Sequence, residues 1–354
     1  MKAAKIIIAV LVCAAILTCG LSQALSSSEQ TEQSPQVDDS NPLFPIKKDG
    51  KWGYMDKRGN IVIDPTWPFA EVFSEGLAVV RSGYLNCYID KTGKVITPKC
   101  DFAYGFSEGL ALVIYYKSHG YSSALLQCPP IIRYGYIDKT GKYVIKPQFT
   151  QAMDFSEGLA AVEYAPMWGY VDKTGRYVID RKFGAVESFS EGLAAVLIGD
   201  KWGYIDKTGN IVINPQFDRG HSFSEGLAMV RIGDKYGYID KTGHVVIKPQ
   251  FLWADEFSEG LAGVEIGFKY GYIDKTGQIV ISQQLDIYPW RFSEGLAAFE
   301  IGGKDGYIDK TGKIVIKPQF DLAWSFSDGL AQVSVGGKYG YIDKTGKYVW
   351  EPTN

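Results

Sequence analysis

Apolar and polar residues alternate along this chain in short runs, and the runs return at a nearly constant interval. One complete period, residues 193–226, reads LAAVLIGDKWGYIDKTGNIVINPQFDRGHSFSEG. Successive copies start 33 to 35 residues apart, except for one step of 49 residues. A fixed period of this length predicts a repeat array. The nine copies begin at Leu43, Leu77, Leu110, Leu159, Leu193, Leu227, Leu261, Leu296 and Leu330.

The first run of each period predicts a β-strand. In residues 227–232 (LAMVRI) the Ala, Val and Ile positions recur at every second residue, and the positions between them hold Gln and Ser in residues 330–335. This period of two predicts a strand with one buried face. A Gly-Asp or Gly-Gly pair follows, as at Gly199-Asp200. Such pairs predict two-residue hairpins, because these turns need a positive φ.

The second strand, residues 202–205 (WGYI), leads into the turn Asp206-Lys207-Thr208-Gly209. Asp at the first turn position can accept a bond from nearby backbone, and Gly at the fourth can adopt a left-handed conformation. The third strand, residues 211–213, should end at Pro215, because proline cannot continue a hydrogen-bond ladder. Each period is therefore predicted to be a three-stranded meander followed by a loop, PQFDxAxxFSEG.

The loop carries aromatic residues that keep their phase from copy to copy, such as Phe217 and Phe223. We expect them to wedge one meander against the next, since burying such a side chain stabilises by roughly 1.5–3 kcal/mol. The Gly after each Glu of the loop is expected to have a positive φ.

Two assemblies of such meanders are open, a superhelical row and a closed β-propeller. Propellers usually close by pairing strands from both chain ends in one sheet. Here the first copy begins at its first strand (Leu43) and the last ends after its third (Val349-Trp350), so no strand is left over. Nine blades also exceed the usual four to eight. We therefore expect an all-β, open, elongated stack of about nine meanders, with the closed propeller as the alternative.

The N-terminal residues of the chain predict export. Residues 1–24 carry Lys2, Lys5 and an apolar run over 6–17 that is shorter than the roughly 20 residues of a membrane span, and they resemble a secretory signal cleaved near Ala24. A lipid anchor at Cys19 is disfavoured because Thr18 precedes it. Residues 25–42 are polar and predict a flexible linker, and residues 43–354 hold the repeats.

Composition excludes one class of partner. The net charge is −3, and removal of the two leader lysines would make it −5. No basic stripe or cluster is present, so a nucleic-acid partner is not expected.

The phrase KWGYID-KTG-xIVI-xPQFD-FSEGLAxV resembles the WG repeat, a family named for its Trp-Gly pair. The resemblance implies a β-rich repeat protein, mostly bacterial and often exported, that binds rather than catalyses, and it supplies no catalytic residue to carry over. Tyr, Asp or Asn stands in place of Trp in the other copies. The pair itself occurs at Trp52-Gly53, Trp168-Gly169 and Trp202-Gly203.

Three patterns that could indicate catalysis or ligand binding have structural explanations. Residues 105–109 (GFSEG) match the nucleophile elbow G-x-S-x-G, yet the other copies lack the first Gly, and the three histidines lie in unrelated registers. The repeated Glu of Ser-Glu-Gly could hold cations, but we favour a carboxylate that accepts bonds from loop amides. The repeated Lys of the turn is interpreted as a solvated tip, with an anionic polymer as the sharper alternative. No enzyme, cofactor or metal site is predicted.

The departures from repetition are the candidate sites. The third copy carries an insertion near residues 114–132, and insertions in repeats often hold individual function. Its Tyr115, Tyr116, His119 and Tyr121 are the tentative ligand-binding residues. Cys100 replaces a loop Phe just before the insertion, which contains Cys128, so an oxidising compartment could join Cys100 to Cys128 and leave Cys87 free. The alternative is three buried or isolated thiols, since Cys packs as a small hydrophobe.

We therefore expect an exported, noncatalytic binding or scaffold protein of the cell envelope or the extracellular space. Its partner would be an unknown protein or a cell-surface polymer, without a membrane span in the mature chain, and the mature chain is expected to be a monomer. The alternative is a carbohydrate or cell-wall polymer binding module, which requires that the Trp and Tyr side chains of the second strands be exposed. Burial of Trp202 would count against that alternative.

Overall fold

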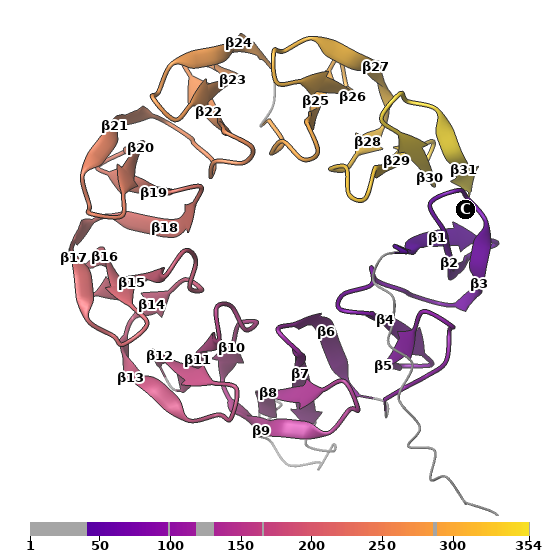
Figure 1. The fold of residues 1–354 in the computed structure, drawn as a ribbon, viewed down its shortest axis with the longest axis horizontal. Helices are drawn as coiled ribbons and strands as arrows, with labels where there is room; N and C mark the ends of the chain where they lie inside the picture. Colours follow the sequence, from indigo (N-terminus) through magenta and orange to yellow (C-terminus); the bar gives the residue numbers. More distant parts are fainter. Residues whose placement is uncertain (1–40, 98–99, 118–130, 165, 286–288, 354) are drawn as a thin grey trace, which may run out of the picture. The chain divides into compact units, whose positions relative to one another are not determined.

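The computed structural model describes residues 41–97, 100–117, 131–164, 166–285 and 289–353. The chain divides into units 1–36 and 37–354, and every described residue belongs to the second unit. These residues form nine small antiparallel sheets that follow one another around a ring (Figure 1). Within the same part of the chain, no helix is long and apolar enough to cross a membrane.

Each sheet is built from consecutive segments of the chain. In chain order the strands are β1 (Phe44–Lys48), β2 (Lys51–Met55), β3 (Ile61–Trp67), β4 (Leu77–Ser82), β5 (Leu85–Asp90), β6 (Phe102–Ser107), β7 (Leu110–Lys117), β8 (Ile131–Asp138), β9 (Tyr143–Phe149), β10 (Gln151–Ala152), β11 (Leu159–Tyr164), β12 (Met167–Asp172), β13 (Tyr177–Phe183), β14 (Ala185–Val186), β15 (Leu193–Ile198), β16 (Lys201–Asp206), β17 (Ile211–Phe217), β18 (Arg219–Ser224), β19 (Leu227–Ile232), β20 (Lys235–Asp240), β21 (Val245–Phe251), β22 (Leu261–Ile266), β23 (Lys269–Asp274), β24 (Ile279–Leu285), β25 (Leu296–Ile301), β26 (Lys304–Asp309), β27 (Ile314–Phe320), β28 (Leu322–Ala323), β29 (Leu330–Val335), β30 (Lys338–Asp343) and β31 (Tyr348–Thr353).

In five of the sheets formed by the described residues, the loop contributes a fourth strand, which the sequence pattern did not predict. The sheets β6-β7-β8-β9, β10-β11-β12-β13, β14-β15-β16-β17, β18-β19-β20-β21 and β28-β29-β30-β31 begin with a strand from this loop. That strand lies toward the ring centre, and the last strand of each sheet lies on the outer rim (Figure 1). We call the loop segments the inner segments. In other sheets they pair through single bridges, such as Ala70 with Val80.

The third strand runs through the proline where we expected it to end. β17 includes Pro215, because β17 is the outer edge strand and its register against β16 shifts between Trp202 and Tyr204. Prolines are tolerated at edges and bulges. The glycine of the Trp-Gly pair allows this approach. A Cβ on Gly203 would lie 2.6 Å from the Ile213 carbonyl oxygen and 2.8 Å from the Pro215 nitrogen.

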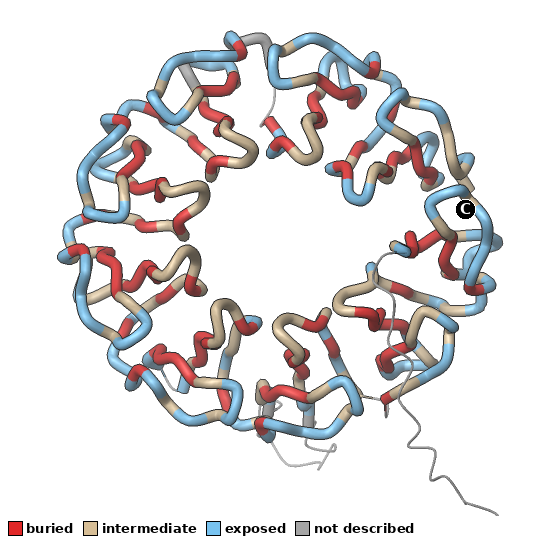
Figure 2. The backbone as a smooth tube through the Cα atoms, in the orientation of Figure 1, coloured by how far each residue is buried: buried red, intermediate tan, exposed pale blue. Residues whose placement is uncertain are grey.

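The first strand of the repeat is buried on both faces, not on one as predicted. Leu193 and Ala195 belong to one hydrophobic cluster, whereas Ala194 and Val196 belong to the preceding one. Each such strand therefore lies between two cores, because a neighbouring sheet packs on either side. Figure 2 shows this burial along the middle strands and the exposure of the outer rim.

The prediction of an open stack is wrong, because the first and last sheets pack against each other and close a propeller. Phe44 of β1 contacts Tyr341 of β30 with ring centroids 5.6 Å apart, and the Tyr341 hydroxyl donates to the Pro45 carbonyl oxygen at 3.0 Å. The Thr353 hydroxyl also donates to the Lys47 carbonyl. Phe44, Ile46, Met55, Leu330 and Tyr341 form one hydrophobic cluster across this seam.

The ring closes without a sheet that contains strands from both chain ends. The absence of a leftover strand therefore wrongly indicated an open stack. Sheet faces, rather than strand edges, join the neighbours at every junction, so a chain without a leftover strand can close. The polar residues at the seam nevertheless differ from those at the other junctions on both sides. Asn41-Pro42 precedes Leu43 where other copies have Glu-Gly, and proline has no N–H to donate. Asp328 replaces the facing Glu.

The Asp-Lys-Thr-Gly turns have the geometry that their residues allow. Asp206 Oδ1 accepts bonds from the Thr208 and Asn210 backbone N–H groups at 2.9 and 3.0 Å, and Gly209 has a φ of 86°. The turn also touches the preceding sheet. A Cβ on Gly209 would lie 3.1 Å from Ile179 Cγ2.

The contact with Ile179 distinguishes Gly209 from Gly199, another turn glycine. Gly209 and Gly199 both have positive φ, but nothing lies within 4 Å of a Cβ at Gly199. Each substitution by Ala should cost about 1 kcal/mol for the conformation. Gly209→Ala should cost more in urea unfolding, and Gly209→Val should cost more still, because both displace Ile179. Equal losses for Gly199→Ala and Gly209→Ala would contradict the packing of the turn on the preceding sheet.

Ring closure can be tested at the seam. Tyr341→Phe removes the hydroxyl that donates to Pro45 and should lower the free energy of unfolding by about 1–3 kcal/mol, since a buried carbonyl loses its donor. Tyr204→Phe is the matched variant inside the ring, where the hydroxyl donates to the His221 carbonyl at 2.9 Å. If the ring were open in solution, Tyr204→Phe alone would be destabilising.

Candidate binding site on the inner segments

A buried tyrosine joins each sheet to the next. The Tyr of the Gly-Tyr pair, or of Cys87-Tyr88 in the second copy, donates its hydroxyl to a carbonyl of the following inner segment at 2.6–2.9 Å, in eight junctions. The same ring meets the Phe of the next Phe-Ser-Glu-Gly at centroid distances of 4.8–5.1 Å. Such aromatic pairs add about 0.5–1.5 kcal/mol beyond burial. These junctions fix the backbone of the inner segments.

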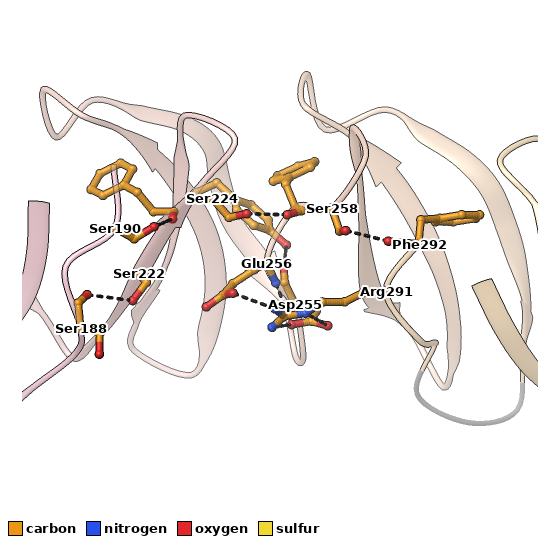
Figure 3. A network of polar contacts seen from close by, with 12 residues as sticks. Ser188, Ser190, Ser222, Ser224, Asp255, Glu256, Ser258, Arg291 and Phe292 are labelled. Atoms are coloured by element: carbon orange, nitrogen blue, oxygen red, sulfur yellow. Dashed lines mark hydrogen bonds and ion pairs between the residues drawn. The ribbon is translucent and has the colours of Figure 1, made fainter. Parts of the chain in front are cut away.

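A second set of contacts runs along the Ser-Glu-Gly motifs. The Ser190 hydroxyl donates to the Phe223 carbonyl of the next sheet at 2.7 Å, and Ser224 and Ser258 repeat the contact (Figure 3). The Glu191 carboxylate accepts the Gly226 N–H at 3.1 and 3.2 Å. It also lies 3.0 Å from the Lys241 ammonium.

The repeated Glu and Lys therefore bind each other and the backbone. Glu side chains accept bonds from loop amides, as we favoured. The repeated lysines differ from the predicted solvated tips, since they reach the carboxylate of the preceding sheet: Lys139, Lys173, Lys207, Lys241, Lys275, Lys310 and Lys344 lie 2.9–3.2 Å from Glu75, Glu108, Glu157, Glu191, Glu225, Glu259 and Glu294 respectively. At side-chain exposures of 28–46%, each pair contributes modestly.

The motif contains a strained position that the sequence pattern did not reveal. The Glu of Ser-Glu-Gly has a positive φ of 48–54°, in addition to the expected positive φ of the following Gly. Side chains other than Gly rarely adopt this conformation. Its bonds to the next sheet hold the Glu in this conformation.

The positions that differ between sheets lie just before each Phe-Ser-Glu-Gly. They hold Glu187-Ser188, His221-Ser222, Asp255-Glu256 and Trp290-Arg291 in four successive sheets. Because the tyrosine hydroxyls fix the backbone here, the side chains can vary while their positions stay constant. The inner segments therefore form a rigid frame with a variable lining, which is the arrangement of a binding surface.

An ionic network occupies this lining. Arg291 donates to both oxygens of Asp255, from Nε at 2.9 Å and from an NH2 nitrogen at 2.6 Å, and to Glu256 at 2.9 Å (Figure 3). One sheet away, Arg219 lies 2.9 Å from Glu187 and its guanidinium stacks 4.4 Å above the Trp202 ring. Bidentate pairs of this type are geometrically specific.

A cleft of about 280 Å³ opens beside this network, and it is lined by His221, Met229, Tyr236, Trp253, Ala254, Asp255, Glu256 and Arg291. Burial and the nearby guanidinium of Arg219 lower the pKa of His221 to about 4. This imidazole is therefore neutral at physiological pH. A second hollow of about 420 Å³ lies at the seam and has mostly apolar walls, including Phe73 and Trp324.

The structure places the predicted residues as follows. Trp202 is only 4% exposed, Trp168 is also buried, and both belong to the cores between sheets, while Trp52 is half-buried. Gly53 and Gly169 approach the third strand in the same way as Gly203. Tyr115 and Tyr116 are each 43% exposed on β7. His119 and Tyr121 lie outside the described residues, as do Cys128, Cys19 and the predicted signal and linker up to residue 40.

Two further expectations concern Cys100 and the apparent nucleophile elbow. Cys100 pairs with Asn86, where Phe217 pairs with Trp202 in another sheet, and its Sγ lies 3.6 Å from the Asn86 carbonyl oxygen. Because Cys128 lies outside the described residues, the bridge to Cys128 stays a prediction. The Ser107 hydroxyl donates to the Phe155 carbonyl at 2.7 Å, like the serines of the other copies.

Comparison with known proteins agrees with this architecture, which is that of a repeat-built β-propeller. The chain matches the WG containing repeat family over most of its length, and it belongs to that family. The matched residues are 52–85, 88–115, 134–164, 168–202, 202–236, 236–269, 270–304 and 306–339. No curated protein matches the chain.

Three solved structures are similar to this chain to different degrees. A eukaryotic initiation factor is similar to this chain with a TM-score of 0.63 and 14% identity, over 89% of this chain and 96% of its own. The dihydro-heme d1 dehydrogenase NirN, solved in complex with DHE, gives a TM-score of 0.44 at 14% identity, over 88% and 73%. Hsv2p of Kluyveromyces lactis gives 0.37 at 10%, over 55% and 75%. At 14% identity, the similarity to the initiation factor concerns the fold alone.

The carboxylates of the Ser-Glu-Gly motif lead to a pH prediction. Burial alone would raise the pKa of Glu191, but the bonds from Lys241 and the Gly226 N–H outweigh it and lower the pKa below 4.5. A lowered folded pKa stabilises the protein above the ordinary value, and this contribution is lost as the pH falls through the folded pKa. We expect the melting temperature of Glu191→Gln to be below wild type at neutral pH.

The difference between the two proteins should shrink as the pH falls below about 4.5. Glu351→Gln changes an exposed carboxylate on β31 and serves as the control. A constant difference between Glu191→Gln and wild type from neutral to acidic pH would contradict the role of this carboxylate.

Proposed function

We propose that this protein is a noncatalytic binding or scaffold protein that contacts its partner through the inner segments of the propeller. One observation carries the proposal: the residues that repeat are occupied in joining sheets, whereas the residues before each Phe-Ser-Glu-Gly vary on a fixed backbone. A rigid scaffold with variable side chains is a common way to build recognition.

We further propose that the protein works after export, in the cell envelope or outside it. Support comes from the leader-like residues 1–24 and the polar residues 25–42 of the sequence. A catalytic role is not proposed, because the apparent nucleophile Ser107 has its hydroxyl bonded to a backbone carbonyl. The partner would be an envelope protein or a cell-surface polymer.

The carbohydrate-binding alternative loses its original basis. It required exposed Trp and Tyr side chains on the second strands, yet Trp202 is buried and Tyr204 is wholly buried. Aromatic side chains of the inner segments, such as Trp253 and Trp290, are the groups that could still meet a sugar. This possibility therefore rests mainly on the inner segments, where the half-buried Tyr236 of β20 is the second-strand aromatic that lines the same cleft.

The proposal can be tested by retention on the mature chain. Immobilised residues 25–354 would be incubated with envelope extract from the native cell, and retained proteins and sugars measured. Glu256→Lys reverses a charge on the inner segment that pairs with β22, and Lys248→Glu reverses one on β21, the exposed outer strand of the preceding sheet. We expect a component that wild type and Lys248→Glu retain and Glu256→Lys loses. Equal retention by all three proteins would rule out the inner segments as the binding surface.

A further inference from the structure

We propose that the cleft between Tyr236, Trp253 and Arg291 binds a single neutral sugar residue of a polysaccharide. This inference rests on the proposed function, because it assigns a ligand class to the inner-segment surface. The cleft combines an aromatic wall with a fixed set of hydrogen-bonding groups on adjacent sheets. Sites of this kind orient a small ligand through a few placed polar groups against apolar walls.

The aromatic wall depends on a coordinated departure from the repeat. Trp253 stands in an inner segment and meets Tyr270 edge to face, with centroids 5.8 Å apart. The strand below it carries Gly263, where the equivalent residues are Ala195 and Met229. A Cβ on Gly263 would lie 3.4 Å from the Trp253 ring and 2.7 Å from Pro289 Cγ. The glycine therefore leaves room for Pro289, whereas a Cβ at this position would only come into van der Waals contact with the indole.

The polar wall can both donate and accept hydrogen bonds. A guanidinium has five N–H donors, and Arg291 uses three of its nitrogens toward Asp255 and Glu256. Further N–H groups and carboxylate lone pairs therefore remain on residues that line the cleft, and the bonds among these residues hold them in one geometry. Sugar hydroxyls also donate and accept, so they match a surface of mixed polarity.

Charge and size select a neutral, small ligand. Asp255 and Glu256 supply two negative charges against the one positive charge of Arg291, which disfavours an anionic sugar. The same guanidinium pairs with both carboxylates and balances one of their two charges, which weakens the attraction for a cation, and His221 adds no charge at physiological pH. The volume of about 280 Å³ lies just below the usual range of small-molecule sites, about 300–1,000 Å³. The cleft therefore suits one residue of a chain rather than a long oligosaccharide.

Calorimetry with defined probes tests the inference on the mature chain. The neutral probes are cellotetraose, maltotetraose, mannotetraose and chitotetraose; the charged probes are tetragalacturonate, a chitosan tetramer and tetralysine. We expect at least one neutral probe to bind, with the dissociation constant raised tenfold or more by Trp253→Ala and by Arg291→Gln. Arg219→Gln is the matched control, since Arg219 also pairs with an inner-segment carboxylate but does not line the cleft.

The outcomes separate this inference from the proposed function. Binding of none of the neutral probes, preference for a charged probe, or equal losses in Arg219→Gln and Arg291→Gln would overturn the sugar site. Arg291 is half exposed, so its substitution is compatible with folding and keeps the test valid if Trp253→Ala does not fold. Retention of an envelope protein that Glu256→Lys abolishes would leave the proposed function standing without the sugar.

Discussion

The contact between a buried tyrosine and the inner segment of the next sheet is the interaction on which the rest of the structure depends. Tyr204 packs against Phe223 and also donates its hydroxyl to the His221 carbonyl, so one side chain supplies both apolar packing and a directional bond. A single sheet has no stable core of its own. The nine sheets are stable because each completes the core of its neighbours, and Tyr341 with Phe44 makes the same kind of contact at the seam.

The strands and turns could be predicted because their causes are local. The period-two pattern of residues 227–232 and the Asp206 and Gly209 of the turn define their elements within a few residues. Ring closure could not be predicted in this way, because it depends on the angle between packed sheets. The absence of a leftover strand suggested an open stack only under the assumption that sheets close by pairing edges.

The candidate site was only partly visible in the sequence. The insertion is the longest break in the repeat, and its tyrosines were therefore predicted to bind a ligand. The ionic network, however, lies around Asp255 and Arg291. These residues are 36 positions apart, and only the packing of successive sheets brings them together. A signal was nevertheless present: the two residues before each Phe-Ser-Glu-Gly change from copy to copy while their neighbours do not.

The hairpins between the first two strands have a consequence for how such a chain can change over generations. A Cβ at Gly199, Gly233 or Gly336 would touch nothing within 4 Å. Extra residues at these tips would therefore disturb no junction, and the third copy, which is about 15 residues longer than the others, has grown at the hairpin of β7 and β8. The ring can thus serve as a carrier on which foreign peptides are displayed at regular angular steps, each grafted without redesign of the others.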